Sequence, residues 1–379
     1  MEKIPVLDLK KQIAPIRQEI DAAIKNVIDN TSFVLGKEVD EFENDVKMYC
    51  KVRCAVGVSN GTDAIKLALV ALGIKPGDGV ICPTFTYFAT AGAIAAIGAV
   101  PVFADIDPMT YNISLGGIIN ALKNPKVKIK AIIPVHLYGQ CADMDGVLDI
   151  AKKNNLKVIE DNAQAFGAEY TPARQTGFGK KSGTIGDCGT VSFFPGKNLG
   201  GFGDAGMVLT DNPDIESKLK ILRNQGNKDK YHHLVLGFNN RLDTIQAAIL
   251  KVKLKYLDDW NKRRRANADY YNHYFKSLMV KIPFVPERNT HIYHQYTLRL
   301  DVSSAELMNH LNSKDIDARV YYPVPLHLQE CFKYLGYRIG DFPESEKAAE
   351  EVLSIPVYPD LTQGQLDYIV GSVKEFFGR

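Results

Sequence analysis

Between residues 54 and 210, short runs of β-branched and other apolar residues alternate with helix-like segments, and this alternation constrains the fold most strongly. Helical segments are predicted near residues 62–73, 86–97, 114–122 and 144–153. Apolar strands that alternate with helices predict a mostly parallel sheet covered on both faces, with ligands bound at the carboxyl ends of the strands. The predicted strands lie at residues 54–58, 79–82, 99–103, 129–135, 156–159, 189–193 and 206–210.

The rest of the chain predicts a second, smaller domain, since 379 residues exceed what one core usually supports. The first 50 residues read as helices, and a long helical stretch runs from 242 to about 278. We expect an α/β protein in which residues 1–250 form helices and a large domain with a seven-stranded sheet. Residues 251–379 would form a long connecting helix and a small α+β domain, with helices at 304–312, 343–352 and 362–376 and strands at 292–300, 317–320 and 354–357.

Composition excludes several classes of partner. The net charge of +2 gives no reason to expect nucleic acid, and we interpret the basic run 262–265 as a solvated helix face. The most apolar stretch, 91–104, is too short to span a membrane. None of the six cysteines forms a Cys-x-x-Cys pair, and no signal-peptide pattern opens the chain, so we expect reduced thiols and a cytoplasmic location.

Lys197 is the residue whose surroundings point most directly to chemistry. It follows a predicted strand and lies between Pro195 and the pair Gly200 and Gly201, on a tight turn. A lysine held in this way can form an imine with a carbonyl cofactor. Asp161 follows a neighbouring predicted strand, and a buried carboxylate there can hold the protonated nitrogen of a pyridine ring. The two residues fit the requirements of pyridoxal phosphate.

Two other loops offer cofactor contacts, each with a structural alternative. Residues 59–63 (Ser-Asn-Gly-Thr-Asp) open a predicted helix, where Gly61 permits close approach and free N–H groups suit a phosphate. The same residue types also cap helices without any ligand. Tyr87, after the strand at 79–82, would stack on a planar ring, whereas core packing is the usual role of an aromatic side chain.

Two other patterns do not carry the chemistry that their residue types suggest. Residues 201–206 match the dinucleotide pattern G-x-G-x-x-G, but they precede a predicted strand instead of opening a helix, so we reject a nicotinamide cofactor. His136, His232 and His233 have no further ligands at zinc-site spacing. We therefore expect no metal.

Taken together, these segments resemble the DegT-type nucleotide-sugar aminotransferases, and the resemblance runs nearly from end to end. It is carried, in the family's order, by residues 55–64, 83–86, 105–107, 134–139, 160–164, 192–200 and 241–248. The resemblance implies a pyridoxal-phosphate enzyme with the fold of type I aminotransferases.

The resemblance also implies a role for each matching residue. Lys197 would bond to the cofactor and move a proton between the cofactor and the substrate carbon, and Asp161 would pair with the ring nitrogen. The other cofactor contacts would be Gln164 at the ring hydroxyl, Tyr87 on the ring face, Gly61, Thr62 and Ser192 at the phosphate, and Asn239 at the phosphate from the neighbouring subunit. The active unit would then be a homodimer with shared sites. Candidate substrate contacts are Arg241, Tyr322 and His327.

By the same resemblance, L-glutamate would supply the amine and a nucleotide-linked keto sugar would receive it. Residues 139–145, 230–233, 242–248 and 320–328 are most similar to members that act on 3-keto sugars, such as UDP-linked N-acetylhexosaminuronic acids. A dTDP-linked 3-keto sugar or a 4-keto 6-deoxyhexose is the alternative. Relatives with histidine in place of Lys197 dehydrate their substrates, so lysine favours amine transfer. A silent regulator is disfavoured because Lys197, Asp161, Gln164 and Ser192 are all retained.

Overall fold

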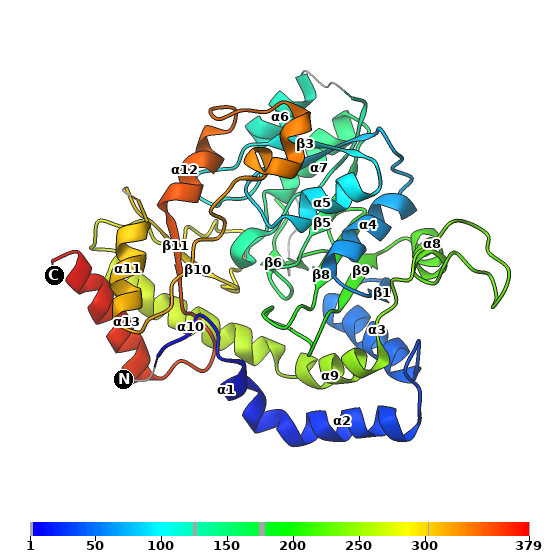
Figure 1. Ribbon diagram of the computed structural model, residues 1–379, viewed down its shortest axis with the longest axis horizontal. Coiled ribbons are helices and arrows are strands. Elements are labelled where there is room, and N and C mark those ends of the chain that lie inside the picture. The colour runs from blue at the N-terminus through cyan, green and yellow to red at the C-terminus, as the bar shows by residue number, and fades with distance from the viewer. Residues whose placement is uncertain (1–2, 124–126, 174–178, 302, 379) are drawn as a thin grey trace.

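The computed structural model describes residues 3–123, 127–173, 179–301 and 303–378, and a seven-stranded sheet forms its centre (Figure 1). The strand order is β1-β9-β8-β5-β4-β2-β3. Only β9 runs antiparallel to its neighbours, so the carboxyl ends of the other six strands meet at one edge. All seven predicted strands are confirmed: β1 (Cys54–Val58), β2 (Gly79–Pro83), β3 (Val100–Ala104), β4 (Ile129–Ile132), β5 (Lys157–Asp161), β8 (Cys188–Ser192) and β9 (Gly206–Thr210).

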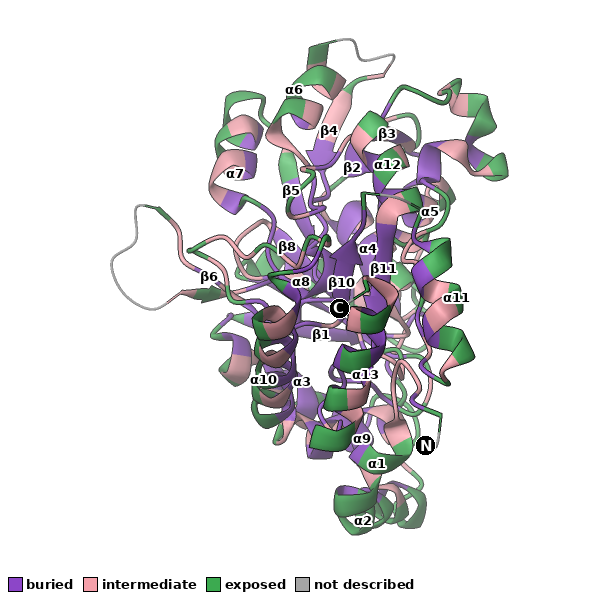
Figure 2. Cartoon of the chain, turned by 90° about the vertical axis from the view of Figure 1, so that its left-hand side faces the viewer, coloured by how far each residue is buried: buried purple, intermediate pink, exposed green. Residues whose placement is uncertain are grey.

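Helices cover both faces of this sheet because successive side chains of each strand point to opposite faces. Val56 and Val208 pack against one helical layer, whereas Val191 and Ile132 pack against the other. The strands are accordingly buried along most of their length (Figure 2). The first layer holds α4 (Gly61–Ala71), α5 (Ala89–Ala96) and α8 (Pro213–Arg223), and the second holds α3 (Lys37–Cys50), α6 (Leu115–Lys123), α7 (Met144–Lys153) and α9 (Thr244–Leu254).

A second hydrophobic core lies beside the sheet and is built mainly from the last third of the chain (Figure 1). Ile4, near the N-terminus, also packs into it and pairs with Ile316. The predicted helices of this part are confirmed, but residues 317–320 form no strand: Arg319 makes only an isolated bridge to Ser354. Its elements are α10 (Leu257–Phe275), β10 (Tyr296–Arg299), α11 (Ala305–Ser313), α12 (Pro343–Glu351), β11 (Val352–Ile355) and α13 (Gln363–Phe376).

The long helical stretch expected from residue 242 is two helices, α9 and α10, with a break at residues 255–256. The expected domain boundary between residues 250 and 251 therefore falls inside α9. The basic run 262–265 also differs from the prediction of a solvated face. Arg264 is buried and donates to the Tyr293 carbonyl at 3.2 Å, and Arg263 forms an ion pair with Asp360 at 2.7 Å.

The remaining segments lie around these two cores. The N-terminal helices α1 (Leu9–Ile13) and α2 (Arg17–Asp29) precede α3, and α2 packs against α9. The polar loop expected at 170–185 has the short strands β6 (Glu169–Tyr170) and β7 (Lys180–Lys181) at its base, and its residues 174–178 lie outside the described residues. None of the helices in the described ranges has the length and apolar character needed to cross a bilayer.

Candidate active site

Lys197 and Asp161 lie at the same edge of the sheet. Asp161 is the last residue of β5, and it is opposite Thr190 on the neighbouring parallel strand β8. Lys197 follows five residues after Ser192, where β8 ends. Because the carboxyl ends of parallel strands form the usual ligand edge of an α/β sheet, the fold places both residues where a ligand would bind.

The loop that carries Lys197 is closed by its own backbone. The Lys197 N–H donates to the Phe194 carbonyl at 2.8 Å, and the Gly201 N–H donates to the Phe193 carbonyl at 2.8 Å. A Cβ on Gly200 would lie 2.4 Å from the Pro195 carbonyl oxygen, so only glycine fits there. Burial lowers the pKa of Lys197 to about 8, and the nearby Asp161 carboxylate partly opposes this shift. Roughly a tenth of the lysine is thus a neutral amine at pH 7, the form that a nucleophile requires and far more than an ordinary lysine provides.

The Asp161 carboxylate is buried and partly satisfied by the protein. It accepts hydrogen bonds from the Thr90 hydroxyl at 2.7 Å and from the Ala163 N–H at 3.2 Å. Burial raises the pKa of Asp161 despite these bonds, because a buried carboxylate lacks the solvation that water gives its charge. Thr90, on α5, was not predicted from the sequence as a site residue. Its hydroxyl lies 3.4 Å from that of Thr86, which precedes α5, and the spacing of four residues between the two threonines is the signal that a search for polar pairs would use.

The first turn of α4 lies against the end of β8. A Cβ on Gly61 would lie 2.6 Å from the Ser192 Cβ, so the two residues are in direct contact. The Asn60 side chain caps the helix by accepting from the Asp63 N–H at 2.8 Å. The first N–H groups of the helix, at Gly61 and the exposed Thr62, have no partner within a helix and suit an anion.

Gln164 joins the site to two tyrosines. Its Oε1 accepts from the Tyr138 N–H at 2.7 Å, and its Nε2 donates to the Tyr322 hydroxyl at 2.7 Å. The Tyr87 ring lies 6.1 Å from the Tyr322 ring, and 59% of its surface is exposed, so one ring face is open to a ligand. Tyr322, expected as a substrate contact, therefore lies beside the residues expected to hold the cofactor ring.

Asn198 and His294 lie beside Lys197 and were not predicted from the sequence as site residues. Asn198 donates to the Asn261 side chain on α10 at 2.7 Å, and its Oδ1 lies 3.1 Å from Nδ1 of His294. Burial lowers the pKa of His294 well below its ordinary value, and the positive charge of Lys197 adds to the shift. These contacts join residues far apart in sequence, so local patterns carry no signal for them.

The residues present fit pyridoxal phosphate. A buried carboxylate suits its ring nitrogen, a lysine with a lowered pKa suits its carbonyl carbon, and a helix start beside a serine hydroxyl suits its phosphate. Asn239 and Arg241 line a cavity of about 460 Å³ next to this helix start, together with Ser59 and Asn60.

His327 has a different environment from the one expected. Its ring is buried, with Nδ1 2.8 Å from the Thr84 hydroxyl and Nε2 3.1 Å from the Glu346 carboxylate. Both ring nitrogens are thus occupied within the chain. This geometry favours a structural role for His327 over the predicted substrate contact.

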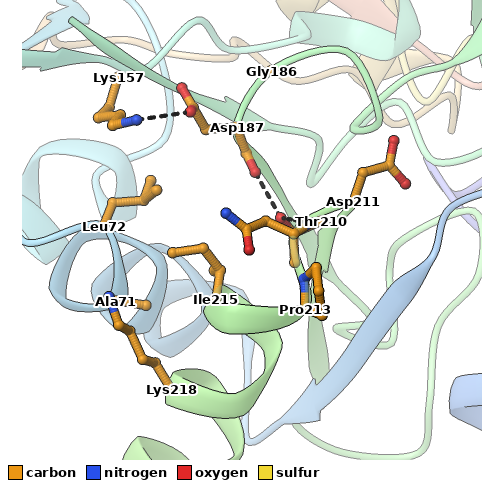
Figure 3. A pocket seen from close by; sticks show the side chains of 11 residues that line it. Ala71, Leu72, Lys157, Gly186, Asp187, Thr210, Asp211, Pro213, Ile215 and Lys218 are labelled. Atoms are coloured by element: carbon orange, nitrogen blue, oxygen red, sulfur yellow. Dashed lines mark hydrogen bonds and ion pairs between the residues drawn. The ribbon is translucent and has the colours of Figure 1, made fainter.

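A larger cavity, of about 580 Å³, lies at the opposite edge of the sheet, and Figure 3 shows the residues that line it. It is lined by Lys157 at the start of β5 and by Thr210 at the end of the antiparallel β9. Asp161 lies four steps along β5 from Lys157, a distance of roughly 13 Å. The Lys157 ammonium forms an ion pair with Asp187 at 3.2 Å, across the cavity wall (Figure 3). This cavity is therefore not part of the Lys197 site.

Known proteins of one family are similar to this chain over nearly its whole length. Residues 14–374 match the DegT/DnrJ/EryC1/StrS aminotransferase family. The pleiotropic regulatory protein of Geobacillus stearothermophilus is 45% identical, with 99% of this chain and 98% of that protein covered. The UDP-N-acetyl-3-dehydro-alpha-D-glucosamine 3-aminotransferase of Acidithiobacillus ferrooxidans is 42% identical, with 98% and 97% covered. Among solved structures, S. venezuelae DesV matches with a TM-score of 0.95 and 38% identity over the full length of both chains.

The match extends over almost the whole chain and includes the sheet, both cores and the loop that carries Lys197. The fold is that of type I aminotransferases, and aminotransferases of this kind use pyridoxal phosphate, the cofactor that the site fits. This chain is a member of the DegT/DnrJ/EryC1/StrS aminotransferase family.

Proposed function

We propose that this chain transfers the amine of L-glutamate to the C3 keto group of a UDP-linked N-acetylhexosamine. The observation that supports amine transfer is that Lys197 and Asp161 lie at one edge of the sheet, with the lysine pKa lowered. The choice of sugar is supported by the 42% identical A. ferrooxidans relative, whose name specifies a UDP-linked 3-dehydro sugar. The uronic acid form of the same sugar belongs to this substrate class, and dTDP-linked keto sugars are the competing class.

In this proposal, bound pyridoxal phosphate supplies the carbonyl group that receives the amine and the ring that withdraws electrons from the substrate carbon. Lys197 acts first as the nucleophile that holds the cofactor and then as the base that takes the proton from the substrate carbon. Its lowered pKa, about 8, favours both roles because the free amine is the form that accepts a proton.

The other residues of the site hold the cofactor and orient it. Asp161 keeps the proton on the ring nitrogen, and its bond from Thr90 fixes the direction of the carboxylate. The start of α4 and the Ser192 hydroxyl bind the phosphate, and Gln164 holds Tyr322 beside the ring. Tyr87 covers one ring face. Each of these residues acts by fixing position before reaction, which lowers the entropic part of the barrier.

We also propose that the enzyme is a cytoplasmic homodimer in which Asn239 reaches the phosphate of the partner's site. Support comes from a long exposed loop between α8 and α9 that extends from the body of the molecule (Figure 1). It carries Tyr231, Leu234, Val235 and Leu236, which are 50% to 97% exposed. Exposed apolar residues grouped in this way are typical of surfaces that bind a second protein.

The test is a substrate panel with wild-type protein and a Lys197→Ala variant. L-glutamate should bleach the visible absorbance of bound pyridoxal phosphate, with L-alanine as the control donor. The bleached enzyme should then regain its colour with UDP-linked 3-keto N-acetylhexosamine, and mass spectrometry should detect an amino sugar. Recovery with a dTDP-linked or 4-keto sugar instead would overturn the choice of substrate. Turnover by Lys197→Ala without added amine would overturn the role of the lysine.

A further inference from the structure

Lys253 is buried directly behind the loop that carries Lys197. It lies in the last turn of α9, its side chain is 1% exposed, and its ammonium donates to the Gly200 carbonyl. Gly200 is three residues after Lys197 and is the position where a side chain does not fit. The ammonium thus holds the backbone of the loop from the core side, at the point where the loop turns back.

Gln246 contacts the same loop from the same helix. Its Oε1 accepts from the Phe202 N–H at 2.7 Å, just beyond the glycine pair that ends the loop. Gln246 and Lys253 are seven residues apart, so they lie two turns apart on one face of α9. The helix is fixed in turn by Ala247 and Leu250, which pack into the same core cluster as Leu199 of the loop. One rigid helix therefore holds two successive points of the loop.

Stability alone is a weak reason for a lysine at this position. Within the described parts of the chain, no carboxylate forms an ion pair with Lys253, and its other near neighbours are the rings of Phe202 at 5.5 Å and Trp260 at 5.9 Å. Burial accordingly lowers the pKa of Lys253 to about 8. Desolvation of this buried charge destabilises the fold, whereas the hydrogen bond to the Gly200 carbonyl stabilises it, so the two contributions oppose each other.

We propose that Lys253 and Gln246 are positioning residues that together fix where the Lys197 side chain lies and the direction in which it points. We call this pair the α9 clamp. Neither residue touches the reacting atoms; both act through the backbone of residues 200–202. The inference rests on the proposed role of Lys197, because only a lysine that must meet a carbonyl carbon and a substrate carbon needs this precision. Misplacement by about 1 Å costs on the order of a hundredfold in rate.

The test compares Lys253→Met with Lys251→Met in the pyridoxal-phosphate-loaded enzyme. Lys251 lies on the same helix, but its ammonium pairs with Glu41 at a partly exposed site away from the loop. For Lys253→Met we expect only a small change in melting temperature, because the removal of a buried charge offsets the loss of the hydrogen bond to the Gly200 carbonyl. We expect kcat to fall about tenfold to a hundredfold at an unchanged KM for glutamate. The absorption maximum of the bound cofactor should shift, and Lys251→Met should match wild type in kcat and spectrum.

Four outcomes separate a positioning role from a structural one and from failure of the proposed function. A lower melting temperature in Lys253→Met with an unchanged spectrum and kcat would show a merely structural lysine and overturn the inference. If Lys253→Met does not fold, Gln246→Met at the more exposed end of the clamp must give the spectral shift, or the inference is wrong. The inference rests on a bond between Lys197 and the cofactor, which is checked by reducing the loaded enzyme with borohydride and locating the modified residue by mass spectrometry. If wild type shows no fixation at Lys197, the proposed function fails; fixation with no effect of either clamp variant refutes the clamp alone.

Discussion

Among single residues, burial acts in the same sense on Lys197 and Asp161, because it disfavours the charged form of each. It lowers the pKa of the lysine to about 8 and raises the pKa of the aspartate. The attraction between the two charges opposes both shifts but does not cancel them. Each group therefore gains stabilisation when an opposite charge enters the site, as a protonated ring nitrogen would beside Asp161.

The shift of Lys197 predicts a pH dependence that can be measured without turnover. Only the neutral amine reacts, so the reactivity of Lys197 should fall as the pH decreases through about 8. At pH 7 roughly a tenth of it would be neutral, against less than a thousandth of an ordinary lysine. The full-length, cofactor-free protein is acylated in short pulses from pH 6 to 11, and mass spectrometry measures the acylation of Lys197. The pH at which acylation is half-maximal is the midpoint. A lysine model peptide is the control, and a midpoint like that of the peptide would contradict the prediction.

Among elements, the strands were predictable and the contacts between distant segments were not. The seven strands of the sheet are visible because each is a short apolar run bounded by turn residues. Residues 317–320 have a similar pattern, but this segment only bridges Ser354 and forms no ladder. Lys197 and Asp161 were predictable as site residues because parallel sheets bind ligands at the carboxyl ends of their strands. The clamp and the satisfied ring of His327 depend on partners 53 and 243 residues away, which no local pattern shows.

The start of α4 predicts that Gly61→Ala weakens cofactor binding. The added Cβ would lie 2.6 Å from the Ser192 Cβ and would push the helix start away from the serine hydroxyl. We expect the dissociation constant of pyridoxal phosphate to rise at least about tenfold, equivalent to about 1.4 kcal/mol, measured by fluorescence titration. The matched control is Gly371→Ala in α13, where nothing lies within 4 Å of the new Cβ.

The control variant Gly371→Ala should itself change the stability of the protein, in the stabilising direction. An alanine inside α13 should stabilise the protein by about 0.5–1 kcal/mol, because glycine is a poor helix former, and should leave cofactor affinity unchanged. If Gly61→Ala bound the cofactor as tightly as Gly371→Ala, the helix start would not be the phosphate site.

At the scale of the whole molecule, the loop between α8 and α9 exposes large side chains that are usually buried. Leu236 is 97% exposed and Tyr231 is 77% exposed, although both are large and apolar. The loop leads directly to Asn239 and Arg241, which line the cavity beside the start of α4. A second copy of the chain that covered this loop would bury its apolar residues and bring Asn239 to a phosphate site, so dimerisation and catalysis would be linked.

Complementation between two inactive variants tests this link. Lys197→Ala removes the nucleophile, and Asn239→Ala removes the residue proposed to reach the partner's phosphate. In a hybrid dimer one site would carry both defects, and the other would combine an intact lysine with an intact asparagine. Random re-association of equal amounts makes about half of the dimers hybrids, so activity should return to about a quarter of wild type. Each variant re-associated with itself is the control. Activity that stays at the mean of the two variants would mean that Asn239 serves its own chain.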